Sequence, residues 1–361
     1  MESKTIEKES LSEKPGKENF VKSNVFKRII FSIFMIVSFC FILQSKNMII
    51  LLIFLIRWLG IFEIMRLSTI KSICPEIYFF CYSIMPCGDI LISYYSRINY
   101  NKTILDISNR ISLFAAFLIY MSSVFIFIIR LKKNNLKNAF TLFSYANIVL
   151  FLISIPLYES VKLLVNYGRF WWFFTTILVI SNDIFAYICG KIFGRTQLIS
   201  LSPKKTKEGY WGAYVLTLLF GYSLILFKEK YNYLYDEGEA VNFGETVCFK
   251  FFSIPSIYIH AFSFIAFAGL AAPFGGFFAS AFKRMMKIKD FSSTIPGHGG
   301  ILDRMDCQIA MACFARIYIK TFVVGFKKPV KKISEHILKK YTKNEIFEIV
   351  KILSKSLSKA N

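Results

Sequence analysis

Histidine and closely spaced cysteine are scarce in this chain of 361 residues. It has three His and eight Cys, and no two cysteines form a CxxC pair. A structural zinc site needs four Cys or His ligands at short spacings, and a disulfide framework needs regularly placed cysteines. The sequence therefore argues against both kinds of site.

Acidic residues are also few, with 23 Asp and Glu against 45 Lys and Arg, so the formal net charge is +22. Nucleic-acid-binding proteins show such a surplus when it lines one soluble face. Here the basic residues lie between apolar runs, where cations attracted to anionic lipid and phosphate are found. We therefore expect a lipid bilayer and phosphorylated ligands as partners, and no nucleic acid.

What the chain has in abundance is apolar residues, which make up 55% of it, with a mean hydropathy of +0.49 and 40 Phe. A soluble domain of this size would expose too much apolar surface with that composition. Runs near the length of a membrane-spanning helix predict an all-α, polytopic integral membrane protein with about eight or nine transmembrane helices. The runs are Ile29–Leu43, Met48–Met65, Ile77–Tyr95, Ile111–Arg130, Ala139–Leu157, Phe170–Ile192, Gly212–Phe227, Ile254–Phe282 and a weaker Gln308–Val324.

Three regions follow from the distribution of polar residues. Residues 1–24 are polar and are expected to form a disordered tail, which the basic residues before the first run place in the cytosol. Residues 25–326 form the predicted membrane-embedded domain. Residues 327–361 carry apolar residues at helical spacing, which predicts an amphipathic helical C-terminal tail.

Two features inside apolar runs have structural interpretations. The aromatic residues of 170–173 are expected to form a belt at the membrane interface, with a base-stacking platform as the less favoured alternative. His260 is expected to make an inter-helix hydrogen bond and not to ligate a metal.

A polar, cationic stretch, Ser280–Asp306, separates the last two runs. Its cations outnumber its carboxylates, an imbalance that suits a polyphosphate ligand and leaves an aspartate pair for a divalent metal. The cations are Lys283, Arg284, Lys287, Lys289 and Arg304, and the carboxylates are Asp290, Asp303 and Asp306.

Asp303 and Asp306 stand three residues apart at the start of an expected helix, so both carboxylates project to one face. The run PGHGG directly before them includes His298, Gly299 and Gly300, and its amides near a helix N-terminus are expected to bind phosphate. An Asp–Arg network that merely caps the helix remains an alternative. His298 is expected to serve as a general acid or to hydrogen-bond the substrate.

A second polar region lies upstream, where Asn182 and Asp183 interrupt an apolar run. Inserting a carboxylate at the centre of a membrane helix costs about 2.5–3.5 kcal/mol, so such a residue usually has a polar partner and a functional role. After it comes SPKKTKE, whose cations and hydroxyls are expected to cradle a phosphate. A structural Asp183–Lys191 pair and a plain juxtamembrane basic loop remain alternatives.

Ser280–Asp306 resembles the signature of the CDP-diacylglycerol synthase (phosphatidate cytidylyltransferase) family. The serine, the KR and KD pairs, the PGHGG turn and the closing DRMD all match the family's spacing, and NDIFAYICGKIFGRTQLISLSPKKTKEG is similar to its other characteristic region. Bacterial members carry a Gly-Asp pair just before the serine, whereas Gly275 and Gly276 stand here, as in the eukaryotic branch. That departure makes Asp183 the candidate for a further metal ligand.

The resemblance implies the reaction of CTP with phosphatidate to CDP-diacylglycerol and pyrophosphate, with Mg²⁺ as cofactor, in the endoplasmic reticulum membrane. It implies Mg²⁺ on Asp303 with Asp306 or Asp183. The implied catalytic residues are Asp303, Asp306, His298, Lys283 and Arg304. The implied substrate-binding residues are Asn182, Ser202, Lys204, Lys205, Thr206, Glu208, Ser280, Arg284, Lys289, Asp290, Gly299 and Gly300. Both a monomer and a homodimer remain open.

Two other functions are weighed against this one. A CTP-dependent lipid kinase of the dolichol kinase type would transfer the γ-phosphoryl group to an alcohol and release CDP. A transporter or scramblase would use Asp183 on a permeation path and would need no CTP.

Overall fold

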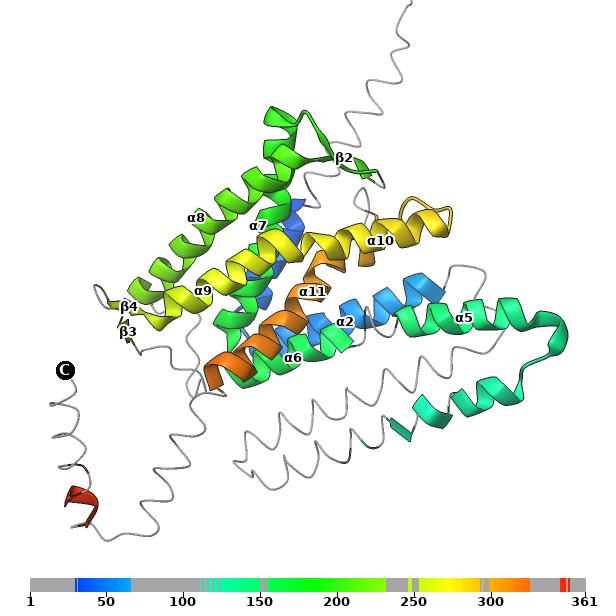
Figure 1. Cartoon of the computed structure of the whole chain (residues 1–361), viewed down its shortest axis with the longest axis horizontal. Helices are drawn as coiled ribbons and strands as arrows, with labels where there is room; N and C mark the ends of the chain where they lie inside the picture. The colour runs from blue at the N-terminus through cyan, green and yellow to red at the C-terminus, as the bar shows by residue number, and fades with distance from the viewer. Residues whose placement is uncertain are drawn as a thin grey trace, which may run out of the picture. The chain divides into compact units, whose positions relative to one another are not determined.

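The computed structural model describes residues 30–350 with gaps (Figure 1). Outside the description lie residues 1–29, 31, 66–110, 112–113, 115–116, 119, 123, 150–152, 154, 201, 232–245, 249–252, 293, 295–298, 325–344, 349 and 351–361. The chain forms two compact units, each described by itself. Unit 1 comprises residues 1–157 and 274–307, and unit 2 comprises 158–273 and 308–361. The predicted N-terminal tail and most of the predicted C-terminal tail lie outside the described residues.

Four of the described helices are long and apolar enough to cross a membrane. They cover Arg169–Phe193, Lys207–Lys228, Ser256–Met285 and Leu302–Val324. Each covers all or nearly all of one of the apolar runs identified in the sequence, which is consistent with the predicted all-α membrane protein for this part of the chain. The total of about eight or nine spans stays a prediction, since Ile77–Tyr95 lies outside the described residues.

Unit 2 is built around α7 (Arg169–Phe193), α8 (Lys207–Tyr231) and α9 (Ser256–Ala266). Its core is aromatic, with Trp171 and Phe174 fully buried against Phe264. Phe170 and Trp172 are buried too, and the Trp172 indole donates to Ser160 Oγ at 2.8 Å. The expectation that residues 170–173 form an interfacial belt is therefore wrong for these aromatics, because they pack inside the unit.

Small residues let α7 and α8 approach closely near their joined ends. A Cβ placed on Gly209 would lie 2.9 Å from both the Gly190 Cα and the Ala186 carbonyl oxygen. Backbones approach at that range only where side chains are absent, as is common between membrane helices. The chain between the helices forms a hairpin of β1 (Gln197–Ile199) and β2 (Ser202–Thr206). A second small hairpin pairs β3 (Thr246–Cys248) with β4 (Ser253–Pro255).

Two polar residues inside the spans of unit 2, His260 and Arg316, contact other polar side chains. The His260 Nδ1 lies 3.0 Å from the Tyr318 hydroxyl, which confirms the expected inter-helix hydrogen bond. Arg316 donates to the Tyr167 hydroxyl at 3.0 Å, and its Nε lies 3.8 Å from Glu159 Oε2. These contacts reduce the cost of placing a cation within an apolar span.

Unit 1 contains α2 (Lys46–Met65), η2 (Lys133–Asn135), α5 (Leu136–Val149), all of α10 (Pro273–Met285) but its first residue, and the start of α11 (Leu302–Tyr318). The end of α10 sets the direction of the polar stretch. Lys287 adopts a left-handed conformation, with φ of 56°, and the Ile288 amide donates to the Lys283 carbonyl at 3.0 Å. That 6→1 bond is the Schellman ending of a helix, and it turns the chain sharply at this point.

Three further helical segments adjoin the helices named above. α6 (Ile155–Tyr167) precedes α7, and the π-helical segments η4 (Phe267–Ala271) and η5 (Ile319–Val324) extend α9 and α11. Residues 345–348 and 350 of the C-terminal tail are helical.

Candidate active site

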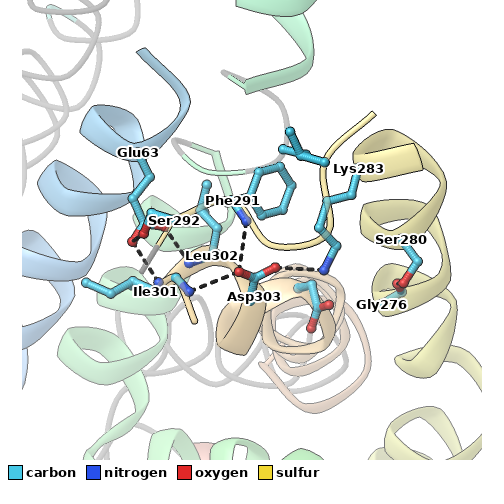
Figure 2. Close-up of polar contacts among 12 residues, drawn as sticks. Glu63, Gly276, Ser280, Lys283, Phe291, Ser292, Ile301, Leu302 and Asp303 are labelled. Atoms are coloured by element: carbon cyan, nitrogen blue, oxygen red, sulfur yellow. Dashed lines mark hydrogen bonds and ion pairs between the residues drawn. The ribbon is translucent and has the colours of Figure 1, made fainter. Parts of the chain in front are cut away.

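Asp303, in the first turn of α11, is the centre of the polar cluster in unit 1 (Figure 2). Its Oδ1 accepts a bond from the Lys283 ammonium at 2.7 Å, and its Oδ2 accepts the amides of Phe291 and Gly300, each at 3.0 Å. The two charged side chains are 12% and 8% exposed, which makes this a nearly buried ion pair. The carboxylate thus joins the end of α10, the following loop and the start of α11.

Glu63, on α2, is a second carboxylate at the same place and was missed by the sequence analysis (Figure 2). It is 2% exposed and accepts bonds from Ser292 Oγ at 2.7 Å, the Ile301 amide at 2.8 Å and the Leu302 amide at 3.1 Å. The only signal in the sequence is an acidic residue within an apolar run.

The contacts of these two carboxylates alter the interpretation of the glycine-rich turn. The amides of Gly300, Ile301 and Leu302 donate to Asp303 or Glu63, so in this conformation the protein's own carboxylates occupy the N-terminal amides of α11. Of the PGHGG amides expected to bind phosphate, that of Gly300 donates to Asp303 here, and its binding of phosphate stays a prediction. Gly299, with φ of 86°, supplies the turn, and His298 lies outside the described residues.

The cations of the stretch fall into two groups. Lys283 is largely buried, bonded to Asp303, and lies 5.4 Å from the centroid of the Phe291 ring. The others are exposed, as is Asp290; they are Arg284, Lys287, Lys289 and Arg304. Arg284 also donates to the Ile288 carbonyl at 3.2 Å. Exposed cations close in sequence to a buried ion pair suit a ligand with several negative charges.

Two glycines let α10 pass directly against the start of α11. A Cβ on Gly275 would overlap the carbonyl oxygen of Asp306. A Cβ on Gly276 would lie 3.0 Å from Cys307 Sγ and 3.4 Å from Asp306 Oδ2, so an aspartate there would face a second carboxylate. This gives a packing reason for the Gly-Gly pair in this chain. Ser280 donates to the Gly276 carbonyl at 2.7 Å within α10.

The donor set is compatible with magnesium only if other ligands complete the coordination. Among the described residues, no group of three or more His, Cys, Asp or Glu side chains could hold a metal ion. Asp303 and Asp306 lie one turn apart, on one face of α11. Mg²⁺ is commonly held by one or two carboxylates, with water and substrate phosphates as its other ligands. A pair of aspartates fits that pattern.

In unit 2, Glu208 fixes the hairpin that carries the second set of predicted residues. Its carboxylate accepts the amides of Arg195 and Thr196, at 3.0 and 3.1 Å, and the Thr196 hydroxyl at 2.7 Å. Thr206 in turn accepts the Gly209 amide at 3.2 Å. These bonds position β2, with Ser202 and Lys205, at the start of α8. They give Glu208 a positioning role in this conformation.

The remaining predicted residues of unit 2 differ in exposure. Asn182 is buried and accepts a bond from Thr217 at 3.2 Å, which links α7 to α8. Asp183 and Lys191 are exposed. The side chain of Lys204 lies outside the described ones. Unit 1 thus brings Asp303, Lys283 and Gly300 together, whereas a joint site with Asp183 and the hairpin stays a prediction.

Replacing Glu208 with glutamine tests the hairpin's role in substrate binding. The amide has one acceptor oxygen in place of two, so the hairpin loses part of its anchoring. Because small displacements of positioning groups have large kinetic effects, we expect an increase of about tenfold in the KM for the phosphorylated substrate that this hairpin is predicted to bind. Steady-state kinetics of the purified variant give this value. Gln197→Ala, which removes the Gln197–Ile199 bond of the same hairpin, is the control, and equal effects of both changes would contradict the assignment.

Comparison with known proteins agrees with the resemblance seen in the sequence. The model of the cytidylyltransferase family matches residues 26–322. The chain is 37% identical over 352 residues to a phosphatidate cytidylyltransferase of Encephalitozoon cuniculi, covering 92% of this chain and 86% of the relative. It is 35% identical over 297 residues to the phosphatidate cytidylyltransferase of Saccharomyces cerevisiae, covering 75% and 65%. With human phosphatidate cytidylyltransferase 1 it shares 37% over 263 residues, 66% and 57% of the two chains.

Proposed function

The chain belongs to the cytidylyltransferase family, and from this we propose that it is a phosphatidate cytidylyltransferase, which converts CTP and phosphatidate to CDP-diacylglycerol and pyrophosphate. The observation that carries the proposal is the family match over residues 26–322, which includes the whole Asp303–Lys283 cluster. The apolar spans suit a substrate whose acyl chains stay in the bilayer.

In the reaction, an oxygen of the phosphatidate phosphate attacks the α-phosphorus of CTP. The bond from the α-phosphorus to the bridging oxygen of the β-phosphate breaks, and pyrophosphate leaves with that electron pair. A phosphomonoester is largely ionised at pH 7, so the attack needs no strong general base. The main requirement is to neutralise two anionic substrates and to hold them in line.

The cations of the polar stretch meet that requirement in our proposal. Arg284, Lys289 and Arg304, all exposed, would hold the triphosphate. Lys204 and Lys205 of the hairpin would hold the phosphatidate phosphate. Lys283 would keep the Asp303 carboxylate oriented through their 2.7 Å contact. His298 would protonate or hydrogen-bond the departing pyrophosphate.

Magnesium would be held by Asp303 and Asp306, with Asp183 as a further candidate ligand. Bound there with the nucleotide, it would neutralise charge on the triphosphate oxygens. Oδ1 of Asp303 accepts one bond from Lys283 and has a second lone pair for such a role. We further propose that the protein resides in the endoplasmic reticulum membrane with its N-terminus in the cytosol.

The test is an assay of detergent-purified protein with CTP, phosphatidate and Mg²⁺. We expect CDP-diacylglycerol as the lipid product and one pyrophosphate released for each molecule formed. Release of CDP would instead indicate a lipid kinase, and lipid flux in liposomes without CTP would indicate a transporter or scramblase.

A further inference from the structure

Glu63 occupies a position that is unfavourable for a carboxylate on two grounds. It is 2% exposed, and burial of an ionised carboxylate is costly unless the group is paired and hydrogen-bonded. It also stands in the last turn of α2, where the negative end of the helix dipole repels an anion. An alanine or leucine would avoid both costs, so the contacts of Glu63 must offset them.

Among the described residues, the hydrogen bonds that offset these costs come from one segment of the chain. Ser292 Oγ, the Ile301 amide and the Leu302 amide donate to the two carboxylate oxygens at 2.7, 2.8 and 3.1 Å. The two amides lie at the N-terminus of α11, whose positive dipole end favours an anion. Hydrogen bonds to an ionised acceptor are about twice as strong as neutral ones. Glu63 thus holds the start of α11.

Asp303 accepts hydrogen bonds from the same two stretches of chain as Glu63, around residues 291–292 and 300–302. It accepts the amides of Phe291 and Gly300, the neighbours of two of the groups that donate to Glu63. Gly300 lies between the two carboxylates, since a Cβ there would be 2.8 Å from Glu63 Oε2 and 3.0 Å from Asp303 Oδ2. The loop from residue 291 to residue 302 is therefore clamped at both ends by two carboxylates (Figure 2).

We propose that Glu63 is a positioning residue for the cytidylyltransferase reaction, an inference that rests on the function proposed above. It holds residues 292, 301 and 302 so that the Asp303 carboxylate keeps one orientation, with Oδ1 toward Lys283. It also occupies the α11 amides, which leaves the triphosphate to the exposed cations. Glu63 itself touches no substrate in this scheme.

The experiment compares Glu63→Gln with the wild-type protein. Glutamine has nearly the same shape, but its single acceptor oxygen cannot accept all three bonds, and its NH₂ group would face an amide donor. By analogy with groups that orient metal ligands, we expect kcat to fall by roughly 10–100-fold and the half-saturating Mg²⁺ concentration to rise about tenfold. A second readout is the thermal stabilisation of the purified protein by CTP with Mg²⁺, which we expect to shrink.

Ser160→Ala is the control for a purely structural effect, because it removes the buried Trp172–Ser160 bond of unit 2. A loss of folded protein lowers the apparent kcat but leaves the half-saturating Mg²⁺ concentration unchanged. We expect that pattern for Ser160→Ala and not for Glu63→Gln. If Glu63→Gln shows only the control's pattern, or kinetics within twofold of wild type, the proposal is overturned.

Ser292→Ala decides the matter if Glu63→Gln does not fold. It removes one donor to Glu63 and leaves both amide bonds in place. We expect a smaller rise in the half-saturating Mg²⁺ concentration, of about threefold. No rise in this folded variant would overturn the proposal. Absence of CDP-diacylglycerol from the wild-type reaction would instead refute the proposed function.

Discussion

Asp303→Asn is expected to lower turnover by about 1,000-fold, the largest effect of any single change in this chain. Asparagine removes the negative charge that pairs with Lys283 and that would help to hold magnesium. Its NH₂ group must also face either the Lys283 ammonium or the amides of Phe291 and Gly300, all of which are donors. Turnover is measured with purified protein at saturating CTP and phosphatidate.

The control for this variant is Glu348→Gln, which makes the same change of chemical group at an exposed position of the C-terminal tail. We expect it to retain wild-type turnover. Size-exclusion profiles identify the folded fraction of each variant, and turnover is compared per folded protein, because Asp303→Asn also leaves Lys283 without its carboxylate. Retention of more than about a tenth of the activity by Asp303→Asn would contradict the role of this carboxylate.

Lys283→Met is expected to have the second-largest effect, on both stability and activity. It leaves the nearly buried Asp303 carboxylate without its cation, and breaking such a pair from one side costs about 3–5 kcal/mol. We also expect kcat of the folded fraction to fall about 100-fold, because Asp303 loses the contact that orients it. Thermal unfolding and steady-state kinetics measure the two effects.

A double variant tests whether Lys283 and Asp303 stabilise the protein through their contact with each other. If Lys283 and Asp303 act as a unit, Lys283→Met with Asp303→Asn should be more stable than Lys283→Met alone, because no unpaired charge remains. Lys133→Met, at an exposed position of unit 1, is the control and should change neither quantity. Additive losses in the double variant would show that the two side chains act independently.

The membrane spans and the polar cluster could be predicted because their signals are local. The length and apolarity of runs such as Phe170–Ile192 and Ile254–Phe282 predict helices, and the structure has helices at both places. The spacing of Asp303 and Asp306 likewise placed both on one face of a helix, and α11 contains them in its first turns.

Contacts between distant parts of the chain could not be predicted in this way. Glu63 bonds to residues 229 to 239 positions away, and nothing near it in the sequence indicates those partners. For the same reason the sequence did not indicate that carboxylates of the protein accept the amides of Gly300, Ile301 and Leu302. The aromatic pattern of 170–173 was also ambiguous, since a buried core and an interfacial belt use the same residues.

The central claim is that the Asp303 cluster directs transfer of the cytidylyl group of CTP to a membrane lipid. The most direct test supplies wild-type and Asp303→Asn proteins, in parallel, with CTP labelled at the α- or at the γ-phosphorus, together with phosphatidate and Mg²⁺. We predict that wild type places the α-label in lipid and the γ-label in pyrophosphate, and that the variant does neither. Lipid carrying the γ-label, or an active Asp303→Asn protein, would contradict the account.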